Sequence, residues 1–536
     1  MLKAENETLK TENRKLQFDL GCLSCSSCGG SRDKLHLENS RLRLELDRLH
    51  SIASLMNPYL PPQETACLFP DTNNLLITEE DKAIAVDLAG SCVQELAKMC
   101  ATNEPLWNKK RSDNERISLN EEEYKKMFKW PSVDDNRFRR EASRASAVVI
   151  MNSITLVNAF LDAMYAELQV VSPLVPTREG YFLRYVKQNA EAEEWMIVYF
   201  PVNGMVKPAS ASTTTDQYRK KPSGCIIQDM SKGYSQITWV EHVEVEEKHV
   251  HHEMVREYVK SGAAFGAERW LAVLQRQCER MASLIMATNI TDLGVIPSVE
   301  AKRNLMKLSQ SMVRTYCLTI SNSYGQALSE SPKETVRMTT RKVCGGVVLC
   351  AVSTTLLPYC EPRFLKLCFL LKMEMLFNEN QFQEVAHIAN GSHPGNAISL
   401  LHFHGPSSSS NNVEWMLQET CTDNSGSLVV YSTVDAYAVH LAMNGEDPSR
   451  IPLLPLGFSV VPVNQPHVFE GISVNLVSCF LTVAVQVLVS DVTTARRDDS
   501  TTAINNRICS IVNRISSMLG SPLLPEIPSS FKQEMS

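Results

Sequence analysis

The sequence predicts an α+β protein with an N-terminal coiled coil followed by two α+β domains. Three observations favour this fold class. Apolar residues recur every seven residues as far as residue 56, which is typical of a coiled coil. Residues 78–287 contain a helix, a series of strand-like segments and a long closing helix. Residues 336–520 repeat that order of strands and a terminal helix, and strands grouped in this way indicate antiparallel sheets.

The coiled coil is predicted over residues 1–56, in two halves. Asparagine at an a position weakens the seam but fixes the register of a parallel dimer, because the amides must pair with each other. We therefore predict a dimer, and an amphipathic helix lying on its own domain is the alternative. The d positions are Leu2, Leu9, Leu16, Leu35, Leu42, Leu49 and Met56, and the a positions with asparagine are Asn6, Asn13 and Asn39.

A cysteine-rich loop separates the two halves and contains Cys22, Cys25 and Cys28. Its overlapping CxxC steps suggest zinc, but three thiols are too few, since a structural zinc site normally has four protein ligands. In a dimer the two loops can share thiols, either as a metal site or as an intermolecular disulfide. A redox-sensitive loop is favoured over zinc, and an unreactive turn is the alternative.

Composition excludes several classes of function. The net charge is −7 and the pI is near 6.0, so the chain has no basic excess with which to neutralise DNA phosphates. The 16 cysteines are expected to be mostly reduced and buried, as at Cys278, Cys350 and Cys479. The longest apolar runs are too short or too charged to span a bilayer. No motif of an enzyme active site occurs, so we predict that the protein is not an enzyme.

The first α+β domain is predicted at residues 78–287, after a polar linker at 57–77. Thr78 and the carboxylates after it favour a helix start there. Further helices are predicted at Ser143–Met164 and Ser261–Met286. The strands are predicted at Ala166–Pro173, Gly180–Gln188, Trp195–Val202, Gly224–Met230 and Tyr234–Val245, with a tight turn at Ser231–Gly233 joining the last two.

One strand carries a candidate polar site. Side chains alternate with period two, so Trp239 and Glu241 share a face that is otherwise apolar. A buried carboxylate needs a partner, and Arg184 is the candidate, with Glu167 as another counter-ion for that arginine. The basic cluster Arg219–Lys221 is interpreted as a solvated loop or a weak nuclear signal.

A metal site is not favoured, because the histidines near this strand match no compact ligand spacing. These histidines are His242, His249, His251 and His252.

A helical connector is predicted at residues 288–335, with a helix from Pro297 to about Cys317. The second α+β domain follows at 336–520, and a disordered tail at 521–536. Its strands are predicted at Val336–Cys344, Gly346–Thr355, Ala397–Phe403, Val413–Cys421, Ser427–Val434 and Val474–Ser490, and its helix at Ser500–Leu519.

Several motifs resemble one known family. The interrupted zipper is followed by Glu104–Trp107, Pro222–Met230, Thr238–Val243 and Phe265–Trp270. Together they resemble plant class IV homeodomain-leucine zipper (HD-ZIP IV) transcription factors. The resemblance covers most of the chain. It implies a nuclear transcriptional regulator that pairs with itself or with related homeodomain-leucine zipper proteins.

The same resemblance implies a START-type helix-grip domain at residues 78–287 and a START-adjacent domain after it. In a START-type domain a curved antiparallel sheet and a long C-terminal helix enclose a tunnel for one sterol or phospholipid, and no other cofactor is expected. An internal Glu/Arg pair often lines that cavity, and a purely structural ion pair is the alternative. The implied cavity residues are Glu167, Arg184, Trp239, Glu241, Phe265, Leu271 and Leu274.

Two departures from the family pattern change the expectation. The chain begins at Met1 already inside the heptads, whereas the family's homeodomain precedes the zipper. Interior strands expected after Ala163 are missing, which would open one wall of the cavity. We therefore expect the chain to reach DNA only through a full-length partner. The alternative is a lipid-binding or lipid-transfer protein whose coiled coil serves only for dimerisation.

Overall fold

The computed structural model describes two α+β units and the helices between them. The described residues are 79–108, 117–128, 137–160, 165–189, 194–201, 218–246, 253–285, 293–294, 296, 298–320, 326–327, 336–343, 346–360, 382–393, 395–403, 414–447, 451, 453–463, 468–469, 472–473, 477–489 and 498–520. The predicted coiled coil, its cysteine-rich loop, the linker and the C-terminal tail lie outside the described residues.

The first unit is built on a nine-stranded sheet in the order β1-β2-β3-β9-β8-β6-β5-β4, with β7 also paired to β9. The strands are β1 (Trp107–Asn108), β2 (Ser118–Leu119), β3 (Phe138–Val149), β4 (Tyr165–Leu168), β5 (Arg178–Asn189), β6 (Glu194–Pro201), β7 (Tyr218–Lys220), β8 (Ser223–Met230) and β9 (Tyr234–Glu246). The helices are α3 (Glu79–Ala101), α4 (Glu121–Met127), α5 (Ser153–Ala159), α6 (Glu253–Lys260) and α7 (Ala267–Ile285).

The second unit is built on a ten-stranded sheet in the order β10-β14-β15-β16-β17-β18-β21-β13-β12-β11. Its strands are β10 (Leu293–Gly294), β11 (Gln326–Ala327), β12 (Val336–Val343), β13 (Gly346–Cys360), β14 (Phe382–Ala389), β15 (Ala397–Phe403), β16 (Glu414–Asp423), β17 (Gly426–Asp435), β18 (Leu456–Val463) and β21 (Val477–Val489). A small hairpin of β19 (Val468–Phe469) and β20 (Ile472–Ser473) accompanies it, with α8 (Val299–Ile320), α10 (Ala436–Met443) and α12 (Asp498–Gly520).

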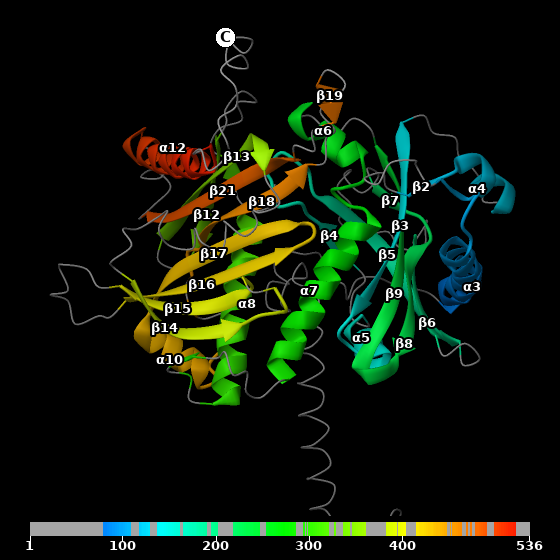
Figure 1. Ribbon diagram of the computed structural model, residues 1–536, viewed down its shortest axis with the longest axis horizontal. Helices are drawn as coiled ribbons and strands as arrows, with labels where there is room; N and C mark the ends of the chain where they lie inside the picture. The colour runs from blue at the N-terminus through cyan, green and yellow to red at the C-terminus, as the bar shows by residue number, and fades with distance from the viewer. Residues whose placement is uncertain are drawn as a thin grey trace, which may run out of the picture.

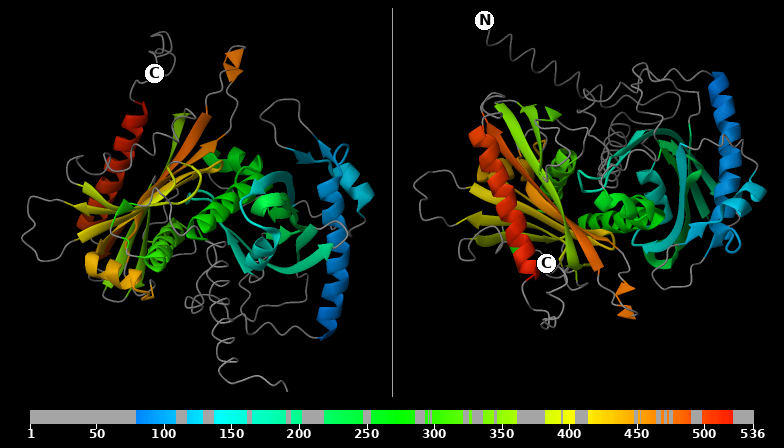
Figure 2. Two further views of the ribbon diagram at one scale, coloured as in Figure 1. Left: turned by 60° about the horizontal axis from the view of Figure 1, so that its bottom comes forward. Right: turned by 90° about the horizontal axis from the view of Figure 1, so that it is seen from above.

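The two sheets face each other across α7 and α8 (Figure 1). Figure 2 shows the layers in sequence: α12, the second sheet, α7 and α8, the first sheet and α3. One large apolar core joins both sheets to α7 and α8, while α3 and α12 each cover an outer face with a separate core. None of the described helices combines the length and the apolar character needed to cross a bilayer.

The long strand β9 organises the first sheet, because it pairs with β3, β7 and β8. The predicted hairpin turn between β8 and β9 is confirmed. Lys232 and Gly233 adopt φ angles of 68° and 79°, the left-handed conformation that such a turn needs. The motif at Trp107 anchors α3, since its indole Nε1 donates to the Met99 carbonyl at 2.8 Å and its side chain is buried.

The prediction of a helix at Ser143–Met164 is wrong for the first half of that range. Residues up to Val149 continue β3 and pair with β9, and among the described residues of this span the helix covers Ser153–Ala159. Ala145 and Ala147 pack on the core while Ser146 on the opposite face bonds Thr238 at 2.9 Å. Alanine and serine differ little in polarity, so their period-two alternation is weak and the prediction followed the helix propensity instead. In the structure, pairing with β9 overrides that propensity.

The strand predicted at Ala166–Pro173 is too long, because β4 ends at Leu168. The next residues leave the first sheet and pack against the second unit. The Ser459 hydroxyl donates to the Val171 carbonyl at 3.0 Å, and the Ser172 and Thr354 hydroxyls bond at 3.0 Å. The apolar run therefore marks a contact between units rather than a longer strand.

The closing helix starts later than predicted, at Ala267, and the separate helix α6 precedes it. The Ser143 hydroxyl on β3 accepts the Ala267 N–H at 2.9 Å, which satisfies one of the unpaired donors of the first turn. In the second unit the predicted strands are present, but β14 and β18 were not predicted. The expectation of a reduced thiol is wrong for Cys479, which is disulfide-bonded.

Candidate functional site

The candidate site is a buried cluster of aromatic side chains between the first sheet and α7, called the aromatic cluster below. The indoles of Trp239 on β9 and Trp270 on α7 stack at 5.2 Å with an interplanar angle of 11°. Leu271 and Leu274 of α7 belong to the same core as Trp239, as the sequence predicts. Phe160, Phe182 and Tyr199 extend the aromatic lining, with ring centroids 5.3–6.2 Å from one another or from Trp239.

A buried ion pair lies among these rings. The Lys220 Nζ on β7 contacts the Glu241 Oε1 at 2.5 Å, and the side chains are 4% and 5% exposed. The Trp239 Nε1 donates to the other carboxylate oxygen at 3.3 Å. Lys220 also lies 5.7–5.8 Å from the ring centroids of three aromatic residues, Phe182, Tyr199 and Trp270. Cation–π contact and the ion pair together compensate the desolvation of the ammonium group.

The prediction that Arg184 is the partner of Glu241 is therefore wrong, since Lys220 takes that place. Lys220 was missed because it lies within a basic cluster that is interpreted as solvated. The period-two alternation of a strand could have shown that Lys220 points to the opposite side from Arg219 and Lys221. Lys220 pairs in register with Val243 and lies on the same face of the sheet as that residue. Lys221 instead pairs with Glu244 at 3.1 Å.

Arg184 contacts the aromatic cluster at Tyr199, and its role in a ligand cavity stays a prediction. Its guanidinium lies 4.9 Å from the Tyr199 ring centroid, and its Nε and Nη1 atoms are buried with no hydrogen-bond partner among the described residues. The Tyr218 hydroxyl on β7 is likewise buried and has no partner within the described part of the chain. Burial raises the pKa of Tyr199 to about 12 and raises the pKa of Tyr218 well above its usual value, so both phenols stay protonated at physiological pH. The Glu167 side chain lies outside the described residues, so its pairing with Arg184 stays a prediction.

Phe265 lies outside the aromatic cluster, contrary to expectation. It packs in a separate cluster with Val170, Tyr258 and Phe480, at the contact between the two units. The Arg178 guanidinium lies 3.9 Å from its ring centroid and forms an ion pair with Glu141 at 2.8 Å. Phe265 thus stabilises the junction instead of lining the site.

The opposite face of β9 carries a buried histidine. His242 is fully buried, its ring meets the Tyr124 ring edge-on at 5.0 Å, and neither ring nitrogen has a hydrogen-bond partner. Burial, and then the nearby cations led by Arg140, lower the pKa of His242 well below its usual value. The other three histidines of the predicted group lie outside the described residues. Within the described part of the chain, no group of His, Cys, Asp and Glu is arranged to hold a metal.

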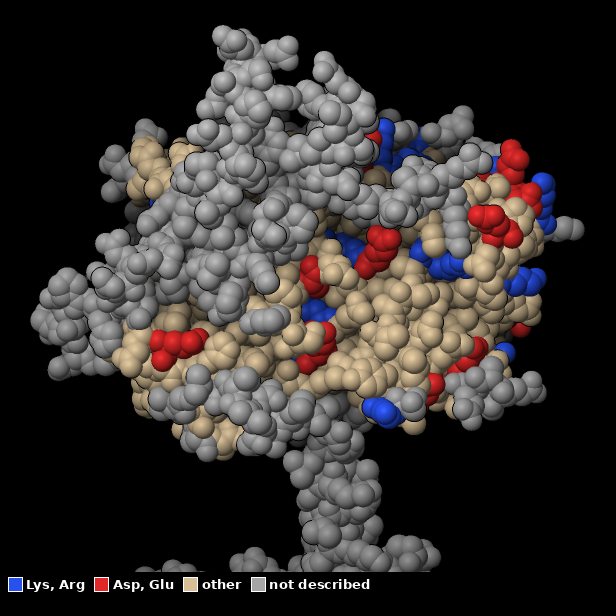
Figure 3. Space-filling view, viewed as in Figure 1, with Lys and Arg blue, Asp and Glu red and all other residues tan. Residues whose placement is uncertain are grey.

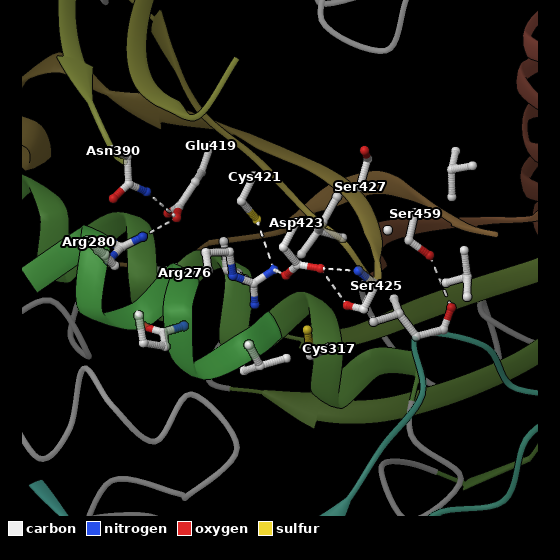
Figure 4. Close-up of a pocket in the computed structure, with 18 of the residues that line it drawn as sticks. Arg276, Arg280, Cys317, Asn390, Glu419, Cys421, Asp423, Ser425, Ser427 and Ser459 are labelled. Atoms are coloured by element: carbon white, nitrogen blue, oxygen red, sulfur yellow. Dashed lines mark hydrogen bonds and ion pairs between the residues drawn. The ribbon is translucent and has the colours of Figure 1, made fainter. Parts of the chain in front are cut away.

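A second polar cluster lies where the face of α7 turned away from the first sheet meets the second sheet (Figure 4). Arg280 forms a buried ion pair with Glu419 of β16, and Glu419 also accepts from Ser309 at 2.5 Å and from Asn390 at 3.0 Å. One turn away, Arg276 pairs with Asp423 at 2.9 Å. A cavity of about 70 Å³ is bordered by Arg276, Arg280, Asn390, Glu419 and Asp423. One face of α7 therefore packs on the aromatic cluster, and the other binds the second unit.

Comparison with known proteins matches both units to family models. The START domain model matches residues 158–280, and the model described as PDF2-like, C-terminal domain, matches residues 298–521. The chain is 64% identical to the homeobox-leucine zipper protein HDG4 of Arabidopsis thaliana over 562 residues, covering 97% of this chain and 77% of that protein.

Two further relatives agree. HDG5 of Arabidopsis thaliana is 52% identical over 648 residues, covering 99% of this chain and 78% of that protein. ROC3 of Oryza sativa subsp. japonica is 37% identical over 677 residues, covering 97% of this chain and 76% of that protein. Both carry the name homeobox-leucine zipper protein. The chain belongs to the class IV homeobox-leucine zipper family of START-domain transcriptional regulators.

Proposed function

We propose that this transcriptional regulator works in the nucleus as a dimer, and that its START region binds a lipid or sterol at the aromatic cluster. Dimerisation is assigned to residues 1–56, with the predicted leucines and asparagines forming the seam. The partner is a second copy or a related homeobox-leucine zipper protein. The observation that carries the ligand proposal is the buried Lys220–Glu241 pair within the apolar, aromatic cluster. A few convergent polar groups in an apolar site are typical of ligand-binding sites.

DNA binding is assigned to the dimer with a homeodomain-bearing relative. The net charge of these residues is −7. On the face of the molecule in Figure 3, Lys and Arg are interspersed with Asp and Glu instead of forming a continuous basic surface. Reading a duplex needs cations on the phosphates and a helix that presents donors to base edges. These 536 residues are therefore expected to lack sequence-specific DNA affinity by themselves.

A gel-shift titration at physiological salt tests the DNA assignment. The purified chain alone should give no shift that only the specific site competes. With a homeodomain-bearing relative, a heterodimer should shift the site more weakly than the relative's homodimer, because one module's worth of base and phosphate contacts is lost. A specific shift by the chain alone contradicts this part of the proposal.

Sedimentation of the full chain tests the dimer. The double variant Leu9→Pro/Leu42→Pro should be monomeric, because proline interrupts both helical halves of the seam. The matched control is Thr65→Pro, which places proline in the predicted linker and should leave the dimer intact. A wild-type chain that remains monomeric at every concentration contradicts the dimer.

A further inference from the structure

The polar cavity between α7, α8 and the second sheet is separate from the aromatic cluster, because it lies on the other face of α7. We propose that this cavity binds a small neutral polyol, whose hydroxyl groups form hydrogen bonds with Gln277, Arg280 and Asn390. The proposal is independent of lipid binding in the START region.

Three buried atoms at this cavity have no hydrogen-bond partner among the described residues. They are Gln277 Oε1, Arg280 Nε and Asn390 Oδ1, and their residues are 6%, 5% and 3% exposed. All three residues border the cavity. Native structures pair nearly all buried polar groups, because an unpaired one lowers stability. A molecule in the cavity that both donates and accepts hydrogen bonds would satisfy all three atoms.

One carboxylate brings two of these residues together. Arg280 Nη1 and Asn390 Nδ2 both donate to Glu419 Oε1, the latter at 3.0 Å, and Figure 4 shows the two side chains meeting there. The bond from Nδ2 leaves Asn390 Oδ1 as the free acceptor. Gln277 lies three residues before Arg280 on α7, and this spacing places both on one side of the helix. One hydroxyl group can accept from Arg280 and donate to Asn390, and a second can donate to Gln277.

The charges at the cavity favour a neutral ligand. The two carboxylates that border it are already in ion pairs, Glu419 with Arg280 and Asp423 with Arg276. A carboxylate ligand would place more acceptors against the free oxygens of Gln277 and Asn390. An ammonium ligand would lie close to the Arg280 guanidinium, and like charges repel strongly in a buried site. A hydroxyl group carries no charge and supplies one donor and two acceptor lone pairs.

The size of the cavity suits a molecule of a few carbons. A buried water needs about 10–15 Å³ of such volume, so 70 Å³ has room for about five waters or for a three-carbon polyol. Gln277 and Arg280 belong to α7, whereas Asn390 follows β14 in the second unit. A bound polyol would therefore contact both units and strengthen their association.

The experiment compares four molecules of similar size by saturation-transfer NMR on the full-length protein. They are glycerol, dimethoxyethane, glycerate and serinol, which are respectively a polyol, an ether without donors, an anion and a cation. A direct measure of binding is needed, because osmolytes stabilise folded proteins without occupying a site. Glycerol should bind about tenfold more tightly than each of the other three, since it alone pairs all three atoms without adding a charge.

A variant then assigns binding to the cavity. Gln277→Met removes the acceptor and keeps a side chain of similar length, so it should weaken glycerol binding about tenfold and leave dimethoxyethane binding unchanged. The matched control is Gln275→Met on the same helix, whose amide instead donates to the Val148 carbonyl of the first sheet at 3.0 Å. This control should bind glycerol as the wild type does. The comparison of ligands on the wild type stands even if Gln277→Met does not fold.

Four results would overturn the proposal. One is dimethoxyethane binding as tightly as glycerol, and another is glycerate or serinol binding more tightly. A third is a folded Gln277→Met protein with unchanged affinity for glycerol. The fourth is no detectable glycerol binding, which would mean that the cavity holds water only. None of these results bears on lipid binding at the aromatic cluster, because no molecule of the panel tests it.

Discussion

Arg280 on α7 is expected to be among the most sensitive positions of the chain. Its side chain is 5% exposed, forms an ion pair with Glu419 and donates to the Met306 carbonyl at 2.8 Å. Arg280→Leu leaves Glu419 buried at 3% exposure with only neutral donors, Ser309 and Asn390. Removing one partner of a buried ion pair costs about 3–5 kcal/mol, because the remaining charge stays in a low dielectric.

Urea unfolding of the full chain measures this effect as a shift in the midpoint. The matched control is Arg303→Leu, whose ion pair with Glu300 has side chains 42% and 60% exposed. Exposed pairs contribute about 0–1 kcal/mol, so this control should unfold close to the wild type. The double variant Arg280→Leu/Glu419→Gln removes both charges and should recover part of the loss.

Two results would refute this reasoning. One is a midpoint shift for Arg280→Leu that is no larger than the shift for Arg303→Leu. The other is a double variant whose loss of stability equals the sum of the two single losses, which would mean that the two charges do not interact.

Three further predictions concern other parts of the chain. Oxidation should give a reducible band of double mass if Cys25 and Cys28 cross-link the dimer, and Cys25→Ser/Cys28→Ser should remove that band. His242 stays neutral in the fold while the unfolded chain takes up a proton below its usual pKa of 6.5; stability should therefore fall as the pH drops from 7.5 to 5.5, and His242→Phe should flatten that dependence. Gly224→Ala should strongly lower the thermal midpoint, because the new Cβ would lie 2.0 Å from the Ile197 carbonyl oxygen and Gly224 has a φ of 138°. A midpoint equal to that of the wild type would contradict this last prediction.

The periodicity of apolar residues was sufficient to predict which faces of the long elements β9 and α7 are buried. The alternation in β9 correctly placed Trp239 and Glu241 on one buried face, because strand geometry fixes which side chains share a side. The apolar spacing of α7 likewise identified Leu271 and Leu274 as core positions. Period-two alternation failed at β3, where alanine and serine fit a helix as well as a strand.

The ion-pair partners of the buried charged residues could not be predicted from the sequence. Lys220 and Glu241 are 21 residues apart, and Arg280 and Glu419 are 139 residues apart. Only strand register and the packing of two units decide which of many charged residues meet. A helical pattern reports which face of α7 is apolar, but it does not reveal that the polar face is buried as well.

The sequence by itself determined the family, the turn between β8 and β9 and the core faces of the longest elements, because these depend on local spacing and residue type. Tertiary structure alone decided that Lys220 is a buried partner, that Phe265 belongs to the junction and that α7 is shared between two sheets. These outcomes follow from contacts between distant segments, where the energy of burying paired charges depends on geometry that no local pattern encodes.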